Sequence, residues 1–245
     1  MKEFFKKFNL FDILYLSISC LVILVVSIIC KSNALTIIYT ILNILSLCLM
    51  AKGFYFAPIP VLVTQVMYAV ISYQGKLYGE TILYVALLIP IQIVTCFKFF
   101  IQRKKEGRDF SVTTIKLKEW IVIAIVALAM CVGVYFLLKA LNTNYLLLSV
   151  PLFVVSVIAT YLVFRRSEYN YIFYLVNGAI YMTVWLLPFI QGNPGGMEVL
   201  PIGIATVAYA INNVRGFINW RKIKKEQNTA ENQELEKKTQ ENIGE

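Results

Sequence analysis

The stretch Arg165 to Trp185, RRSEYNYIFYLVNGAIYMTVW, begins with two arginines and continues as a long apolar run with the amide of Asn177 near its middle. A helix needs about 20 largely apolar residues to cross the hydrocarbon core of a bilayer. An amide at that depth lacks water, so it requires a partner from the protein or from a ligand. Asn177 is therefore a candidate ligand-binding residue, and a structural hydrogen bond to a neighbouring helix is the alternative.

The composition of the whole chain indicates a membrane protein with several spans. The 245 residues are 59% hydrophobic and 15% charged, whereas soluble domains contain about 25% charged residues. The net charge of +9 does not indicate nucleic-acid binding, because the basic residues stand at the ends of apolar runs, where they act as topology signals. Histidine is absent and the five cysteines have no shared spacing, so we expect neither a metal site nor a cofactor.

Seven further apolar runs accompany the one that contains Asn177. The predicted spans are residues 13–30, 35–51, 56–73, 80–100, 120–138, 146–164, 171–190 and 199–217. With the N-terminus inside, the outer loops contain only Lys31, Lys76 and Lys139 of the 23 basic residues, as the positive-inside rule favours. The sequence thus predicts an all-α protein of the cell membrane with eight transmembrane helices and both termini in the cytoplasm.

The predicted spans also suggest an internal repeat. Spans two to four and six to eight run in the same directions and are joined by span five, and aligning the two groups places Gln65 on Asn177. Parallel repeats of this kind occur in transporters. The expected organisation is a lead-in and extra first helix (1–34), a first three-helix repeat (35–102), a basic loop and linker helix (103–145), a second three-helix repeat (146–222), and a disordered tail or frayed helix (223–245).

Four stretches, in the same order along the chain, resemble the PnuC-type vitamin transporters, a family whose reference members carry nicotinamide riboside. They are AKG at Ala51–Gly53, YQGKLYGE at Tyr73–Glu80, LIPIQIV at Leu88–Val94 and YAINNVRGFINW at Tyr209–Trp220. The resemblance implies an architecture related to the SWEET sugar transporters and assembly as a homotrimer. It also implies facilitated diffusion, with a cytoplasmic kinase that traps the vitamin by phosphorylation.

The candidate binding residues combine this resemblance with the amides and aromatic rings of the predicted spans. The family pattern Trp-x-x-Trp-x-x-x-Asn corresponds here to Asn170, Phe173 and Asn177, and Thr160 stands where the family often has glutamine. A heteroaromatic ring that carries a sugar needs an aromatic face and several amides or hydroxyls. The candidates are Asn177, Phe173, Asn170, Gln65, Gln92, Asn212, Thr160, Trp185 and Tyr84. Asn43 also lies inside a span, but no motif surrounds it and we assign it to helix packing.

The expected function is transport and not catalysis. Acidic residues occur only at the edges of the predicted spans, as at Asp12, Glu80 and Glu119, so no carboxylate is expected near the midplane to couple transport to protons or sodium. We therefore predict a uniporter for a vitamin-like or nucleoside-like solute, with nicotinamide riboside first. Thiamine, a deoxynucleoside and riboflavin are alternative solutes, and a substrate-binding subunit of an ATP-driven carrier is an alternative role. The expected partners are this solute, membrane lipids and the kinase.

Overall fold

The computed structural model describes residues 8–75, 77–106, 111–143, 145–193 and 196–243, and all regular structure in these ranges is helical, as predicted. The elements are α2 (Leu10–Ile29), α3 (Ala34–Ala51), α4 (Pro58–Gln74), α5 (Tyr78–Leu83), the π-helical turn η1 (Tyr84–Leu88), α6 (Ile89–Glu106), α7 (Leu117–Ala140), α8 (Leu146–Phe164), α9 (Asn170–Ile190) and α10 (Gly196–Ile243). The predictions for residues 1–7, Lys76, residues 107–110 and residues 244–245 lie outside the described residues.

Seven helical segments of the described chain are long and apolar enough to cross a membrane, which confirms a multi-pass membrane protein. One of them is continuous through α5, η1 and α6, from Tyr78 to Lys104. The helix at the predicted third span, α4, is shorter than each of these at 17 residues, because it begins at Pro58 and ends just before Gly75. The count of eight spans therefore stays a prediction.

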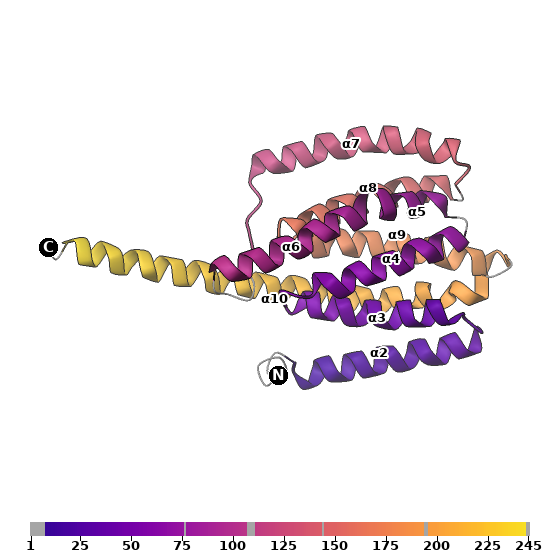
Figure 1. Cartoon of the computed structure of the whole chain (residues 1–245), viewed down its shortest axis with the longest axis horizontal. Helices are drawn as coiled ribbons and strands as arrows, with labels where there is room; N and C mark the ends of the chain where they lie inside the picture. The colour runs from indigo at the N-terminus through magenta and orange to yellow at the C-terminus, as the bar shows by residue number, and fades with distance from the viewer. Residues whose placement is uncertain (1–7, 76, 107–110, 144, 194–195, 244–245) are drawn as a thin grey trace.

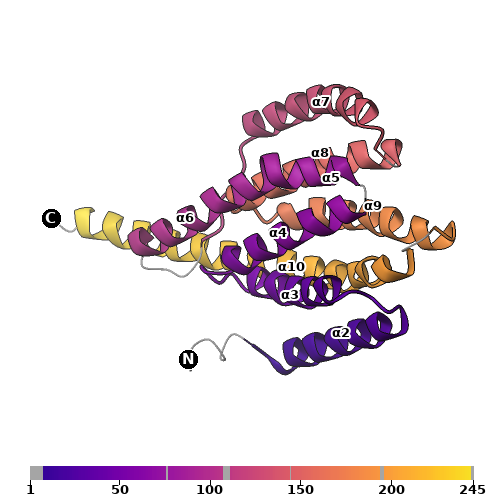
Figure 2. The same ribbon diagram turned by 45° about the vertical axis from the view of Figure 1, so that its right-hand side comes forward.

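The helices form two groups that pack against each other (Figures 1 and 2). In the first group α4 packs against α3 and α6, and in the second α9 packs against α8 and α10. The groups meet where α3 contacts α10 and where α6 contacts α8. Two helices are peripheral, since α2 packs against α3 and α10, and α7 packs against α8 at the opposite edge of the molecule. The middle helices α4 and α9 are thus in position to line a site between the groups.

The two ends of this bundle differ. The start of α2 lies at the end from which the last part of α10 protrudes, and we call this the terminal end (Figure 1). The α2–α3 and α9–α10 connections lie at the other end, which we call the loop end. Basic residues such as Lys52, Arg103 and Arg165 lie where α3, α6 and α8 end, at the terminal end of the bundle.

The C-terminal segment, for which we expected either a disordered tail or a frayed helix, is helical. The last helix, α10, is 48 residues long and continues without a break to Ile243. Glu, Lys and Gln, which are strong helix formers, dominate this segment, and neither proline nor glycine occurs between Phe217 and Ile243. Nothing in the local sequence therefore terminates the helix where it leaves the apolar bundle.

Candidate substrate-binding site

A cavity of about 100 Å³ lies between the two helix groups, and its wall is formed by residues of α3, α4, η1, α8, α9 and α10. Its aromatic lining consists of tyrosines, namely Tyr39, Tyr68, Tyr84, Tyr174, Tyr181 and Tyr209. Its polar lining consists of amides and hydroxyls, namely Asn43, Thr64, Gln65, Ser156, Thr160, Asn177 and Asn213. None of the described residues that line it is charged at neutral pH.

The two middle helices place a carboxamide on opposite sides of this cavity. Asn177 of α9 is half-buried, and its Oδ1 accepts a hydrogen bond from the hydroxyl of Ser156 at 3.1 Å. Gln65 of α4 is buried, and its Oε1 has no hydrogen-bond partner within the described structure. Buried amide oxygens are almost always bonded in proteins, so the free acceptor of Gln65 is suited to a donor from a ligand.

The π-helical turn η1 presents Tyr84 and Leu88 to the cavity. In this turn the backbone N–H of Ile89 donates to the carbonyl of Tyr84, five residues back. Pro90 follows directly, and proline has no N–H to donate and clashes with the carbonyl four residues earlier in a regular helix. The wider turn relieves that conflict, and its two ends, Tyr84 and Leu88, both line the cavity.

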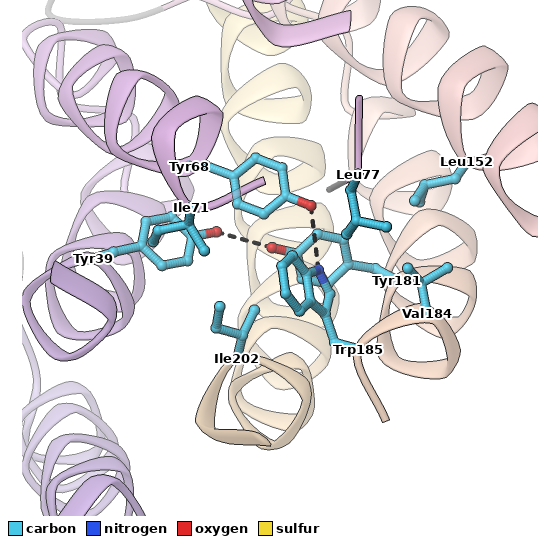
Figure 3. Close-up of a cluster of buried hydrophobic side chains, with 9 residues drawn as sticks. All are labelled: Tyr39, Tyr68, Ile71, Leu77, Leu152, Tyr181, Val184, Trp185 and Ile202. Atoms are coloured by element: carbon cyan, nitrogen blue, oxygen red, sulfur yellow. Dashed lines mark hydrogen bonds between the residues drawn. The ribbon is translucent and has the colours of Figure 1, made fainter. Parts of the chain in front are cut away.

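An aromatic layer formed by Tyr39, Tyr68, Tyr181 and Trp185 covers the cavity toward the loop end (Figure 3). The ring of Tyr68 lies 5.6 Å from that of Tyr39 and 5.6 Å from that of Tyr181, measured between centroids. The hydroxyls of Tyr39 and Tyr181 are 3.1 Å apart, and Trp185 Nε1 donates to the Tyr68 hydroxyl over 3.2 Å. These bonds connect α3, α4 and α9.

A second cavity, of about 470 Å³, lies on the other side of the aromatic layer at the loop end. Trp185 lines it together with polar residues of the connecting loops and helix ends, including Asn33, Gln74 and Glu198. Because Tyr39, Tyr68 and Tyr181 line the first cavity and Trp185 lines the second, the aromatic layer separates the two. It therefore has the position of a gate.

The first cavity is also covered toward the terminal end. Tyr171 of α9 and Trp220 of α10 are buried there in a cluster with Leu49 and Met50 of α3. The rings of Tyr171 and Trp220 meet edge to face at 5.1 Å, and Trp220 Nε1 donates to the carbonyl of Met50 over 3.2 Å. The cavity thus lies between two layers of packed aromatic side chains.

Four of the nine predicted site residues line this cavity, and they come from four different helical segments. These are Gln65, Tyr84, Thr160 and Asn177. Trp185 does not line it, since its indole is buried in the aromatic layer and borders the cavity at the loop end. Asn177 thus lines the cavity between the helix groups, and Trp185 belongs to its cover.

The other four predicted residues lie elsewhere, for reasons specific to each. Phe173 stacks on Trp120 of α7 at 6.1 Å. Asn170 is the first residue of α9, about two turns away from Asn177, and its Nδ2 donates to the carbonyl of Ser167 over 2.6 Å. Gln92 donates to the carbonyl of Pro58 over 2.9 Å and so joins α6 to the start of α4. Asn212 lines a different cavity, beside Lys52.

Two cavity residues that the sequence analysis did not select are asparagines. Asn43 lines the cavity, although we assigned it to packing, and Asn213 lines it in place of Asn212. A signal for Asn213 was present, because Tyr209 lies four residues earlier, and residues four apart share a face of a helix. Tyr209 also lines the cavity.

Glu80 lies at the edge of its span, as expected from the sequence, but its side chain is buried. It belongs to the first turn of α5, yet only 2% of its surface is exposed. The Tyr68 hydroxyl donates to its Oε2 over 3.5 Å, so this carboxyl group lies beside the aromatic layer. Among the described residues no cation forms an ion pair with Glu80, and a buried carboxyl without such a partner is expensive to keep ionised, which makes Glu80 a candidate functional group.

Comparisons with known proteins identify the family and the fold of the chain. Residues 33–222 match the family model described as nicotinamide mononucleotide transporter. The nicotinamide riboside transporter PnuC of Neisseria mucosa is 27% identical over 172 residues, which are 67% of this chain and 63% of that protein. The match thus spans less than two thirds of the relative's length.

A solved structure, described as the crystal structure of the vitamin B3 transporter PnuC, has the same fold. Its TM-score is 0.76 and its identity 23%, over 89% of this chain and 94% of that chain. The PnuC-type resemblance of the four sequence stretches is thereby confirmed. Because the family model covers well over half of its length, this chain belongs to the nicotinamide mononucleotide transporter family.

Proposed function

We propose that the protein is a uniporter of the cell membrane for a nicotinamide riboside-like solute, and that the tyrosine-lined cavity is its binding site. The observation that carries the proposal is an uncharged cavity between α4 and α9, with Gln65 and Asn177 on opposite walls and an aromatic layer toward each end. Aromatic faces with a few placed amides suit a flat heteroaromatic ring that carries a sugar.

The lining favours the riboside over the mononucleotide. Nicotinamide riboside carries a positively charged pyridinium ring, and tyrosine faces attract such cations. A phosphate monoester carries about two negative charges near neutral pH and is normally bound by Arg, Lys or backbone N–H groups at a helix start. The described cavity wall contains no Arg or Lys, so a phosphate there would lose its hydration without an ionic partner.

We infer that α4 is an eighth membrane span and that the two helix groups are the parallel repeats of a SWEET-like architecture. Support for the eighth span comes from the path of the chain. The chain enters the bundle at the start of α2 and leaves it along α10 at the same terminal end, as an even number of spans requires. Further support is that Gln65 and Asn177, which the repeat alignment equates, line one cavity. A relative tilt of the groups would open one aromatic layer at a time, as alternating access requires.

The basic helix junctions support a cytoplasmic terminal end, where a kinase would trap the imported solute by phosphorylation. Thiamine, a deoxynucleoside and riboflavin are the other solutes to be tested, because each combines a flat ring with polar edges. Assembly as a homotrimer is likewise an implication of the family.

Proton-coupled transport is a second candidate mechanism, and Glu80 is the observation that favours it. This buried carboxyl touches Tyr68 of the aromatic layer, so a change in its protonation would alter a contact of the gate. We favour uniport because Glu80 does not line the binding cavity.

The test is uptake into liposomes that contain only the purified chain. Labelled nicotinamide riboside should equilibrate across the membrane without ATP, and the mononucleotide should not enter at a comparable rate. An inward proton gradient should leave the initial rate unchanged, whereas strong stimulation would replace uniport by proton coupling. Binding of the solute without any uptake would instead support the role of a binding subunit in an ATP-driven carrier.

A further inference from the structure

A third cavity, of about 220 Å³, lies at the terminal end between α2, α3 and α10, apart from the proposed transport path. Three cationic side chains line it: Lys52 at the end of α3, and Arg215 and Lys222 on α10. The amides of Asn9, Asn212 and Asn219 and the thiol of Cys48 complete its polar wall. A cavity that combines cations with amide donors is suited to a phosphate group.

The local charge is positive. Lys52 and Arg215 both form ion pairs with Asp12, whose carboxylate is fully buried behind them. Among the described residues, two cations therefore share one carboxylate and leave a net positive charge next to the cavity. Lys222 adds a further positive charge at the rim of the cavity, where its exposed side chain lies 3.9 Å from the carboxylate of Glu226. An anion in the cavity would balance this excess.

Asn212 supplies an independent indication of a ligand. Its side chain is 1% exposed and lines the cavity, and neither Oδ1 nor Nδ2 has a hydrogen-bond partner within the described structure. Its neighbour Asn219, by contrast, is satisfied by the carbonyl of Ala51 at 2.8 Å. Both polar atoms of a buried amide are rarely left unpaired in a native protein. The Nδ2 group of Asn212 is therefore a donor available to a phosphate oxygen.

The surroundings of the cavity favour a lipid as the source of the phosphate. Ile218 lines the cavity and is 62% exposed, and Val214 and Ile211 continue an exposed apolar stripe along α10. The neighbouring helix α2 is peripheral and exposes many large apolar residues. Acyl chains would lie along this surface, with the headgroup at the level of the basic helix ends.

We propose that this cavity binds the phosphate group of an anionic ligand, and that in the membrane this ligand is an anionic phospholipid. Lys52, Arg215 and Lys222 attract the phosphate, and Asn212 donates a hydrogen bond to it. The same helix, α10, contributes Tyr209 and Asn213 to the transport cavity, so a bound headgroup would fix a helix that both sites share.

The test measures the thermal stability of the full-length chain in neutral detergent with three probes, of which two are short-chain lipids and the third is inorganic phosphate. Dioctanoyl phosphatidylglycerol should raise the Tm, and dioctanoylglycerol, which has the same chains without phosphate, should not. Inorganic phosphate is compared with chloride at equal ionic strength. If inorganic phosphate protects as well as the lipid, the site takes phosphate from solution and the lipid assignment fails. If dioctanoylglycerol protects equally, the phosphate site itself is refuted.

Variants of residues that line the cavity test whether phosphatidylglycerol binds there. Lys222→Gln should weaken phosphatidylglycerol binding about fivefold, as expected for one basic residue near an anionic headgroup. Asn212→Leu changes no charge and should weaken binding about 12- to 160-fold by removing a hydrogen bond to a charged group. Lys225→Gln is the matched control, because Lys225 lies on the same helix outside the cavity lining. If Asn212→Leu does not fold, the proposal is tested by comparing Lys222→Gln with Lys225→Gln. Equal affinities of these two variants for phosphatidylglycerol would rule the proposal out.

Discussion

The indole Nε1 of Trp185 donates a hydrogen bond over 3.2 Å to the hydroxyl of Tyr68, and this bond joins α9 to α4, the middle helices of the two groups. The Tyr68 hydroxyl also contacts the buried carboxyl of Glu80 on α5. Opening the loop end of the transport cavity requires the two groups to separate, so this hydrogen bond must break. The pair is therefore a specific point at which gating can be tested.

Trp185→Phe should make the aromatic layer open more often. The phenyl ring keeps most of the packing but removes the donor, which is worth about 0.5–1.5 kcal/mol, or roughly two- to twelvefold in an opening equilibrium. The measurement is the labelling rate of Thr64→Cys, a cavity residue, by a membrane-impermeant maleimide in a background without other cysteines. Trp120→Phe, on the peripheral helix α7, is the control and should leave that rate unchanged. Equal labelling of both variants would show that the bond does not hold the gate.

Asn177→Ala should weaken solute binding. Losing a ligand hydrogen bond in a buried site costs about 1–3 kcal/mol, which corresponds to roughly five- to 150-fold in Kd. Phe173→Ala is the comparison on the same helix, because Phe173 packs on Trp120 and should change Tm but not affinity. Titration of both purified variants with nicotinamide riboside tests this. A Kd for Asn177→Ala within twofold of the parent would remove Asn177 from the site.

Glu80→Gln separates uniport from proton coupling. Glutamine matches the size of the carboxyl group but cannot release or bind a proton at physiological pH. For a uniporter, uptake into liposomes should change by less than about threefold, and neither the parent nor the variant should respond to a proton gradient. For a proton-coupled carrier the gradient would stimulate the parent and not the variant. Initial uptake rates with and without the gradient distinguish the two.

Gly216→Ala should destabilise the layer at the terminal end. A Cβ atom there would lie 2.3 Å from the ring of Tyr171, so the ring or the helix must move. Overpacking of this kind costs about 1–3 kcal/mol, and the Tm should fall. Gly133→Ala on α7 is the control, since its Cβ would meet no atom within 4 Å. Adding Tyr171→Val to Gly216→Ala should restore part of the lost Tm if the clash is the cause.

The sequence by itself determined the class of protein and the positions of most helices, and it selected two amides that line the cavity between the helix groups. An apolar run that crosses the membrane must make its backbone hydrogen bonds within the protein, and a helix makes all of them within the run itself. The positions of these helices could therefore be predicted from the sequence. Asn177 and Gln65 could be selected because a polar amide is costly inside an apolar membrane span and therefore marks a candidate functional residue.

Only the tertiary structure decided which other residues line the cavity together with Asn177 and Gln65. Each residue turns a helix by about 100°, so Asn213 faces the transport cavity while Asn212 faces the basic cavity at the terminal end. The usual guide to the inward face is a polar stripe, but here both the lipid-facing and the protein-facing sides are largely apolar. The burial of Glu80 likewise depends on Tyr68 from another helix, a contact that no local pattern specifies.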